Sequence, residues 1–391
     1  MGRMRTTQLI YWLKNSLRTI LRPMLPLIRA VRTLPARQSA RQAAAHLQVT
    51  TGISVCYLTN QFPARPALRS EYSFGGAVKL TFLAESFPHS YPQASLLYTV
   101  SSVDHVAKSA IVRAARSKGL KIVLNQNGVS YPAWYGKGWE VPNRKMREIY
   151  EQADFIVYQS EFCRLGAENF LGKCAALSQV IYNPVDLGLF HPANITTRRN
   201  GPTLLLGGNQ LAVYRLDVAA QVLCQLIQTL PETRLIITGK LWGDNQSVAM
   251  HEATSILNKL GVAKQVEFTG QYSQENAIKI FQRADILIHT QYNDASPTLI
   301  GEALACGLPA VYSSSGGVPE LVGPDAGIGI SVEQSWDKIS LPNPTQMASA
   351  ILTVWEELPV FSDAARQRAV EQFPLEKFVQ AHRELFTRLL D

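Results

Sequence analysis

The chain has 391 residues, of which 46% are hydrophobic and 17% charged, a composition that fits two ordered domains and excludes a disordered protein. Its formal net charge of +8 is unevenly spread, because residues 1–70 hold eleven Lys or Arg and no Asp or Glu, which leaves 27 bases and 30 acids in the rest. The globular part therefore lacks the overall positive charge that attracts nucleic acid, and we expect no nucleic-acid partner.

The chain begins with a basic amphipathic segment. Apolar residues gather on one face of a predicted helix over residues 9–21, while Lys14, Arg18 and Arg22 line an adjacent arc. The segment is too short and too charged to span a bilayer, but its bases and Trp12 suit an anionic membrane surface. Three interpretations stay open for residues 1–45: attachment to a membrane surface, a packing helix or partner-binding arm, and an organelle transit peptide.

From residue 51 onward, short apolar runs alternate with helical stretches, which is the pattern of parallel sheets with crossover helices. After Asn183 and Pro184 the pattern restarts, so we predict two doubly wound α/β domains that face each other across a cleft. The predicted strands are 53–58, 96–100, 121–124, 155–158 and 179–182 in the first domain, and 203–206, 234–238, 265–269, 286–289 and 310–314 in the second. Predicted helices include 106–118, 146–152, 217–230 and 375–390.

Residues 289–323 are the most informative stretch, because they place Asp294 and Glu302 around a helix start. Ser296 is a good N-cap residue and Pro297 suits the first helical position, so we predict a helix over 297–306 that ends before Gly307. The free backbone N–H groups of its first turn suit a phosphate, whereas the two carboxylates suit the hydroxyls of a sugar or ribose.

The strand at 310–314 delivers a second glycine-rich turn. Gly316 and Gly317 form this turn, and Pro319 and Glu320 begin another helix. Together with the two acids, the turn resembles the signature of the family 4 nucleotide-sugar-dependent glycosyltransferases: an acid, seven residues, a Glu, and about fourteen residues later Gly-Gly-x-Pro-Glu. Asp294 replaces the commoner first Glu, so the negative charge is kept on a shorter side chain.

Two further segments extend the resemblance to about residues 51–391. Residues 157–164 (VYQSEFCR) look like the family's strand and Ser-x-Phe turn, and residues 180–192 (VIYNPVDLGLFHP) look like its interdomain linker. The resemblance implies the GT-B architecture: a Rossmann-like acceptor domain at 49–184, a Rossmann-like nucleotide-sugar donor domain at 185–374, and a C-terminal helix at 375–391 that crosses back to the first domain. The basic N-terminal segment, at 1–48, precedes these domains.

The resemblance also implies the site residues. Arg215, Asp294 and Glu302 are the expected catalytic residues: Arg215 as a phosphate clamp, Asp294 on the donor sugar and Glu302 on the ribose. An Asn, Asn209, stands where the family usually has its first base, and a solvated helix position is the alternative for Arg215. The other expected donor-binding residues are Gly75, Gly76, Asn127, Gly208, Asn209, Ser296, Thr298, Leu299, Gly316, Gly317 and Glu320, the last of which would order the glycine turn.

The first domain departs from the family at one further point. Asn127 stands where the family often places a His, and His105 is a substitute that a structural histidine would equally explain. A plain loop is likewise the alternative for the Gly75 and Gly76 pair. The resemblance implies retention by front-face attack, in which a phosphate oxygen of the donor takes the proton of the acceptor, so loss of the usual His is tolerable.

Metal and cofactor signals are weak in the sequence. The five cysteines form no CxxC pair, the histidines lack metal-ligand spacing, and no Asp-x-Asp occurs, so we expect no metal, no cofactor and a reducing compartment. The resemblance implies a retaining hexosyltransferase, which we expect in the cytoplasm, with peripheral attachment at the inner face of a membrane as an option. It would move a sugar from a nucleotide-diphosphate sugar to a glycolipid, polysaccharide or other hydroxyl acceptor. A catalytically silent GT-B protein that binds a sugar nucleotide or a partner enzyme is the alternative, and an epimerase or hydrolase on the same architecture is a third.

Overall fold

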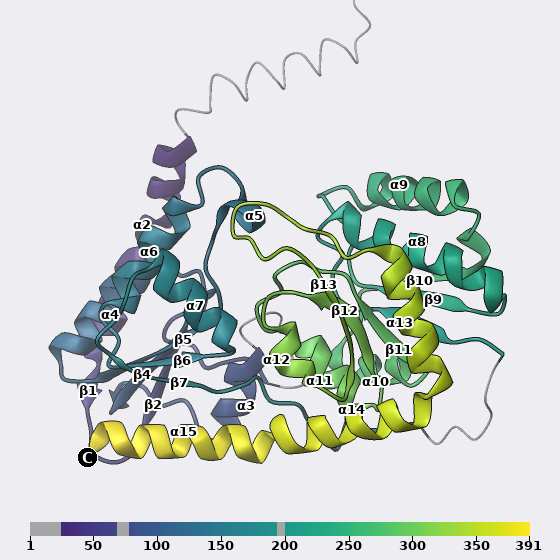
Figure 1. Ribbon diagram of the computed structural model, residues 1–391. Helices are drawn as coiled ribbons and strands as arrows, with labels where there is room; N and C mark the ends of the chain where they lie inside the picture. The colour runs from purple at the N-terminus through teal and green to yellow at the C-terminus, as the bar shows by residue number, and fades with distance from the viewer. Residues whose placement is uncertain (1–24, 69–77, 194–199) are drawn as a thin grey trace, which may run out of the picture.

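The structure, a computed structural model, describes residues 25–68, 78–193 and 200–391. It consists of two α/β domains side by side, and a pair of C-terminal helices runs beneath both of them (Figure 1). The predicted amphipathic helix over residues 9–21 and the glycine pair Gly75 and Gly76 lie outside the described residues. Among the described helices, none combines the length and the apolar character needed to cross a membrane.

The first domain is built on a five-stranded parallel sheet whose strands follow chain order, β2-β4-β5-β6-β7. The first four strands are buried on both faces, as the continuous apolar runs of a helix-covered parallel sheet require. The strands are β2 (Val55–Leu58), β4 (Leu96–Val100), β5 (Lys121–Gln126), β6 (Phe155–Tyr158) and β7 (Leu177–Val180), with a two-residue pair of β1 (Gln48–Val49) and β3 (Gln93–Ala94) beside them.

Helices cover both faces of this sheet. One face packs against α2 (Leu25–His46), α4 (Lys108–Ser117), α6 (Glu140–Tyr150) and α7 (Glu161–Phe170), and the other against α3 (Val78–Ser86) and the C-terminal helix α15 (Leu375–Leu390). Ala40, Ala44 and Leu47 are buried in the core of this domain. Residues 40–47 therefore belong to the first domain rather than to the separate N-terminal segment that the sequence suggested.

The second domain holds a six-stranded parallel sheet in the order β10-β9-β8-β11-β12-β13, which reverses direction between β8 and β11. This reversal is the switch point of a doubly wound fold, where ligands bind beyond the carboxyl ends of the strands. The strands are β8 (Thr203–Leu206), β9 (Arg234–Thr238), β10 (Val266–Gly270), β11 (Ile286–His289), β12 (Ala310–Ser314) and β13 (Gly327–Ser331). Of these, β13 was not predicted, because glycines interrupt its short apolar run.

The helices of the second domain form two layers around its sheet. One layer contains α8 (Val213–Thr229), α9 (Gln246–Lys259) and α13 (Pro344–Glu356), and the other contains α10 (Gln274–Phe281), α11 (Thr298–Ala305), α12 (Val318–Val322) and α14 (Leu358–Gln372). The short helix α5 (Pro132–Tyr135) and the 3-10 turn Ala263–Gln265 complete the elements of the described chain.

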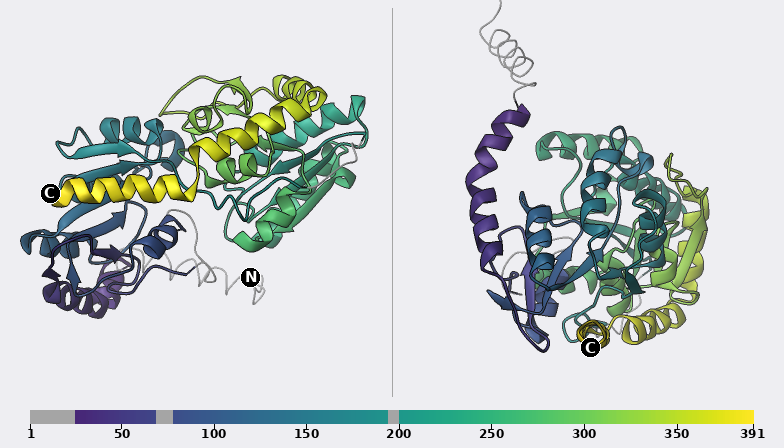
Figure 2. Two further views of the ribbon diagram at one scale, coloured as in Figure 1. Left: turned by 90° about the horizontal axis from the view of Figure 1, so that it is seen from below. Right: turned by 90° about the vertical axis from the view of Figure 1, so that its left-hand side faces the viewer.

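Helix α15 crosses back from the second domain onto the first, as predicted (Figure 2). Its apolar face packs on the first sheet, where the Phe386 and Phe87 ring centroids lie 5.0 Å apart. The buried His382 Nε2 lies 3.0 Å from the Tyr98 hydroxyl, and a hydrogen bond joins them. The C-terminal helix therefore ties the second domain to the core of the first.

Candidate functional site

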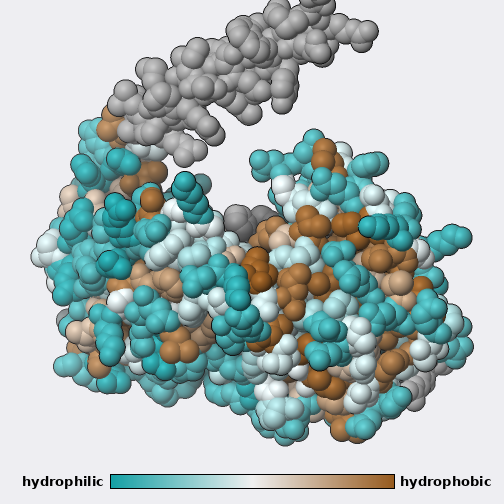
Figure 3. Space-filling model, turned by 45° about the horizontal axis from the view of Figure 1, so that its top comes forward, coloured by the Kyte–Doolittle hydropathy of each residue, from teal (hydrophilic) through white to brown (hydrophobic). Residues whose placement is uncertain are grey.

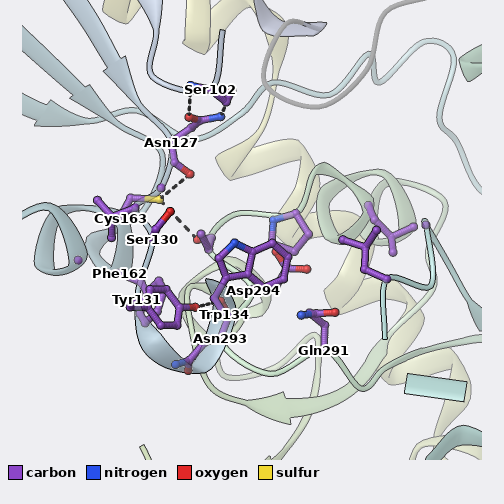
Figure 4. Close-up of a pocket in the computed structure, with 18 of the residues that line it drawn as sticks. Ser102, Asn127, Ser130, Tyr131, Trp134, Phe162, Cys163, Gln291, Asn293 and Asp294 are labelled. Atoms are coloured by element: carbon purple, nitrogen blue, oxygen red, sulfur yellow. Dashed lines mark hydrogen bonds between the residues drawn. The ribbon is translucent and has the colours of Figure 1, made fainter. Parts of the chain in front are cut away.

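A cavity of about 470 Å³ lies between the two domains, beyond the carboxyl ends of β5 and β11. Ser102, Asn127 and Tyr131 of the first domain line one wall, and Gln291, Asn293 and Asp294 of the second line the other (Figure 4). Of the predicted site residues, it brings together Asn127, Gly208, Asn209, Arg215, Asp294, Thr298 and Leu299.

The Asp294 loop is held by the glycine turn that follows β12. The Gly317 N–H donates to the Asp294 carbonyl at 2.8 Å, and a Cβ on Gly316 would collide with that same carbonyl. A Cβ on Gly317 would collide with the carbonyl of Ala295. Gly316 and Gly317 were predicted to contact the donor, but the structure places them behind the Asp294 loop, where only glycine permits so close a backbone approach.

Asp294 has a buried histidine beside it. His289, at the end of β11, is 1% exposed and lines the cavity, and its Nε2 lies 3.3 Å from Asp294 Oδ2. The approach does not meet hydrogen-bond geometry, and both ring nitrogens of His289 lack a hydrogen-bond partner among the described residues. The pair therefore offers a polar surface that a bound hydroxyl can complete.

The helix that follows Asp294 begins one residue later than predicted. Its N-cap is Pro297, and no side chain of the described residues caps it. Ser296, predicted as the cap, instead donates from Oγ to the Gln159 carbonyl at 3.2 Å and accepts from Asn183 Nδ2 at 3.3 Å. The cap prediction was wrong because the Ser296 hydroxyl is engaged by the first domain and the linker. The Thr298 and Leu299 N–H groups are left without a partner among the described residues, beside the cavity.

Glu302 lies one turn further along α11 than Thr298 and on the same side of the helix. It does not line the 470 Å³ cavity itself. Its carboxylate makes no hydrogen bond or ion pair within the described chain, and burial raises its pKa to about 7. Burial raises the pKa of the Tyr272 phenol, and the nearby Glu302 carboxylate raises it further. Glu302 is therefore a desolvated acceptor without a donor.

Arg215 is buried rather than solvated, with 4% of its surface exposed. Its guanidinium donates to the carbonyls of Gly207, at 3.1 Å, and Asn209. Burial lowers the pKa of Arg215, while the nearby Asp294 carboxylate raises it. The interpretation of Arg215 as a solvated helix residue is wrong, and its contacts show that it organises the turn after β8.

Asn209 and Gly208 form that turn. The Asn209 side-chain oxygen accepts from the Lys240 N–H at 2.9 Å, and Gly208 adopts a positive φ of 75°. Asn209 therefore ties the β8 turn to the β9 turn and carries no charge into the cavity. A Cβ on Gly207 would collide with Leu299, so the turn also lies directly against the start of α11.

Asn127, at the end of β5, is engaged with its neighbouring loop. Its side-chain oxygen accepts from the Ser101 hydroxyl and the Ser102 N–H at 2.5 and 3.2 Å, and its nitrogen donates to the Ser102 hydroxyl at 2.8 Å. His105 does not line the cavity, because its Nδ1 accepts from the Ala107 N–H at 3.1 Å in the adjoining groove. It does not stand in for the missing histidine, and its contact is a structural one.

Glu320 joins the two domains instead of ordering the glycine turn. Its carboxylate accepts from the N–H groups of Glu161 and Phe162, at 2.9 and 3.1 Å, at the start of α7. Helix N-termini favour a carboxylate at this place. The predicted donor contact of Glu320 therefore does not match the structure, which uses its charge across the domain interface.

An aromatic cluster closes one side of the cavity and was not predicted. Trp336, in the loop after β13, enters a pocket formed by Tyr131, Phe162 and Phe170 of the first domain. The Tyr131 hydroxyl donates to the Asn293 carbonyl at 3.2 Å, next to Asp294. The sequence carries no motif for this cluster, and the aromatic residues before and within α7 were its only signal.

Comparison with known sequences relates most of the second domain to a family. Residues 193–341 match the family described as glycosyl transferases group 1. D-inositol 3-phosphate glycosyltransferase of Mycobacterium leprae (strain Br4923) is 29% identical over 192 residues, 48% of this chain and 45% of that protein. The enzyme of the same name from Mycobacterium sp. (strain KMS) is 26% identical over 195 residues. The chain thus matches less than half the length of these relatives.

Solved structures share the fold. Anabaena HepE in complex with UDP aligns with a TM-score of 0.58 at 18% identity, over 75% of this chain and 79% of that one. Sucrose-phosphate synthase from Thermosynechococcus elongatus aligns with a TM-score of 0.60 at 17% identity, over 80% of this chain and 77% of that one. The described chain has the GT-B fold, as the sequence predicted.

Proposed function

We propose that this chain, whose residues 193–341 form a glycosyltransferase group 1 domain, transfers a sugar from a nucleotide-diphosphate sugar to a hydroxyl acceptor with retention at the anomeric carbon. One observation carries the proposal. The carboxylate of Asp294, the start of α11 and the turn that Arg215 organises all line the same interdomain cavity. The structure of Anabaena HepE with UDP-glucose, which shares this fold, supports the donor class.

The cavity, together with Glu302 beside it on α11, suits the parts of such a donor. The Thr298 and Leu299 N–H groups, at the positive end of α11, would receive the diphosphate. Asp294 would accept hydrogen bonds from sugar hydroxyls, and Glu302, further along the same helix, would accept those of the ribose. The buried charge of Arg215 would stabilise the departing diphosphate through the turn that it holds.

The proposed chemistry needs no protein base. As the bond between the anomeric carbon and the phosphate oxygen breaks, the acceptor hydroxyl attacks from the side on which the diphosphate leaves. A phosphate oxygen takes the hydroxyl proton, so the products are the glycoside and the nucleoside diphosphate. The engagement of Asn127 with Ser101 and Ser102 fits this scheme, because the scheme assigns that position no proton transfer.

A panel of sugar nucleotides tests the function. Purified protein is expected to hydrolyse or transfer from at least one donor, and Asp294→Asn is expected to lower kcat/KM about 100-fold, a loss of about 3 kcal/mol in transition-state stabilisation. Asp325→Asn, an exposed change in the same domain, is the matched control. Equal activity of the two variants would contradict the role of Asp294.

The second candidate is a silent GT-B protein that binds a sugar nucleotide without turnover. Asn209 and Asn127 favour it, since both use their amide groups to hold loops and bring no charge to the cavity. Nucleoside diphosphate binding by a protein that turns over none of the donors in the panel would select this candidate.

We also propose that the basic segment preceding α2 attaches the protein to the cytoplasmic face of an anionic membrane. Its bases and Trp12 support this proposal. Because Ala40 and Ala44 are buried in the first domain, the test removes only residues 2–24. Sedimentation with phosphatidylglycerol vesicles should weaken on deletion and with added salt; unchanged sedimentation would exclude the attachment.

A further inference from the structure

A second groove, of about 1020 Å³, lies in the first domain between α2, α4, α6 and the loop after β4. Ser102 and Met146 line both this groove and the interdomain cavity, so the two spaces adjoin. The groove therefore extends from the proposed transfer site over the domain that does not carry the donor turns. In Figure 3 hydrophilic residues cover much of the surface of this domain.

Positive charge dominates the groove. Five basic residues line it against two acids, Asp104 and Glu148, and Glu148 accepts a hydrogen bond from the Ser109 hydroxyl at 2.7 Å. Lys108 donates to the carbonyls of Val100 and Val103, at 2.6 and 3.1 Å, and so holds the loop after β4. The other four bases, on α2, α4 and α6, are Arg37, Arg41, Arg113 and Lys145.

These four bases are exposed, and none of them makes a hydrogen bond or ion pair within the described chain. Arg37 and Arg41 stand four residues apart on α2, a spacing at which like charges destabilise a helix. The fold thus brings to one concave surface four cations from three helices that have no ion-pair partner among the described residues, and the two acids of the groove do not balance them. Such a surface suits a bound anion, and guanidinium groups match the geometry of a phosphate.

Resting on the proposed transferase function, we propose that this groove binds a phosphate group carried by the acceptor, whose hydroxyl then reaches the cavity past Ser102 and Met146. A neutral sugar acceptor would leave the four cations unpaired. The phosphate group belongs either to a soluble phosphate monoester or to a lipid headgroup, and the two sources share this chemistry.

The test compares two variants of the full-length protein. Arg41→Gln with Arg113→Gln removes two groove cations from separate helices, and Arg144→Gln removes an exposed cation that lies next to Lys145 on α6 but outside the groove. One arm titrates glycerol 3-phosphate by calorimetry; the other sediments the protein with vesicles of phosphatidylglycerol and phosphatidylcholine. Thermal unfolding confirms that each variant is folded.

The double variant is expected to bind at least tenfold more weakly in one arm, while Arg144→Gln matches the wild type. Loss in the soluble arm identifies a phosphate monoester, and loss in the vesicle arm alone identifies a headgroup. If the double variant and Arg144→Gln behave alike in both arms, the groove proposal is overturned. Transfer activity that does not depend on the groove would leave the proposed function standing and overturn the acceptor role of the groove. Phosphate binding in the groove without any transfer would refute the proposed function and, with it, the acceptor role.

Discussion

The indole of Trp336 in the second domain stacks on the ring of Phe162 in the first, with centroids 4.7 Å apart and planes inclined by 24°. Because both residues line the interdomain cavity, this contact joins domain packing to the shape of the site. Offset stacking and T-shaped contacts contribute about 0.5 to 1.5 kcal/mol beyond burial, so Trp336 stabilises the observed domain arrangement.

Trp336→Ala is therefore expected to loosen the domains and to raise KM for the donor about tenfold or more, with each domain still folded. Small-angle scattering should show a larger radius of gyration than in the wild type. Trp336→Phe keeps a stacking ring, so its radius of gyration and its KM should lie between those of the wild type and of Trp336→Ala. An unchanged radius and an unchanged KM in Trp336→Ala would contradict the role of this contact in closing the cavity.

Ser160 caps α7 and contacts the other domain at once. Its Oγ accepts from the Cys163 N–H at 3.0 Å and donates to the Ala295 carbonyl at 2.6 Å. Ser160→Ala removes the cap and a buried interdomain hydrogen bond, and each loss should lower the free energy of unfolding by about 1 kcal/mol. Ser273→Ala is the matched control, since Ser273 caps α10. Urea unfolding should show a larger decrease in the free energy of unfolding for Ser160→Ala than for Ser273→Ala. Equal decreases would exclude an interdomain contribution.

Gly317→Ala should displace the Asp294 loop, because the new methyl group would collide with the Ala295 carbonyl. This carbonyl is part of the backbone and cannot rotate away as a flexible side chain could. Nucleoside diphosphate binding by calorimetry should weaken about tenfold or more. Gly188→Ala places a methyl group 3.4 Å from Asp186 Oδ1, an ordinary contact, and should bind like the wild type. Tight binding by Gly317→Ala would show that the glycine turn does not position Asp294.

The pKa of Glu302 rises from 4.5 to about 7 on folding because burial disfavours its charge. The folded protein then binds more protons than the unfolded chain between about pH 4.5 and 7, so Glu302 makes stability fall as pH rises through this window. Glu302→Gln should stabilise the free protein by about 1 to 2 kcal/mol at pH 8, with little effect at pH 4, and should weaken nucleotide binding. Denaturant unfolding at several pH values measures this difference, with exposed Glu356→Gln as control. If the free energy of unfolding depends on pH in the same way for the wild type and Glu302→Gln, the raised pKa of Glu302 is excluded.

Local patterns predicted most of the fold. Strands such as Phe155–Tyr158 and Ile286–His289 were predicted with their observed bounds, because each is a continuous apolar run that ends at polar residues. Gly317 and Asp294 both belong to the spaced acid and glycine motif, so the sequence indicated the two residues that meet. It predicted, however, that the glycine contacts the donor rather than the Asp294 loop.

Contacts between the domains could not be predicted in the same way. The engagement of Ser296 by Gln159 and Asn183, and of the Glu320 carboxylate by α7, depends on how the two sheets face each other. No local period or spacing encodes that geometry. The same reason applies to Trp336 and to the basic groove, whose cations come from three helices.

The account depends most on one claim, that the interdomain cavity binds the donor nucleotide. A crystal structure of the protein with the nucleoside diphosphate that binds tightest in a calorimetric panel tests it directly. We predict the diphosphate at the start of α11, beside the turn held by Arg215, with the ribose hydroxyls on Glu302. A nucleotide bound elsewhere, without contact to Thr298, Leu299 or Glu302, would contradict the account.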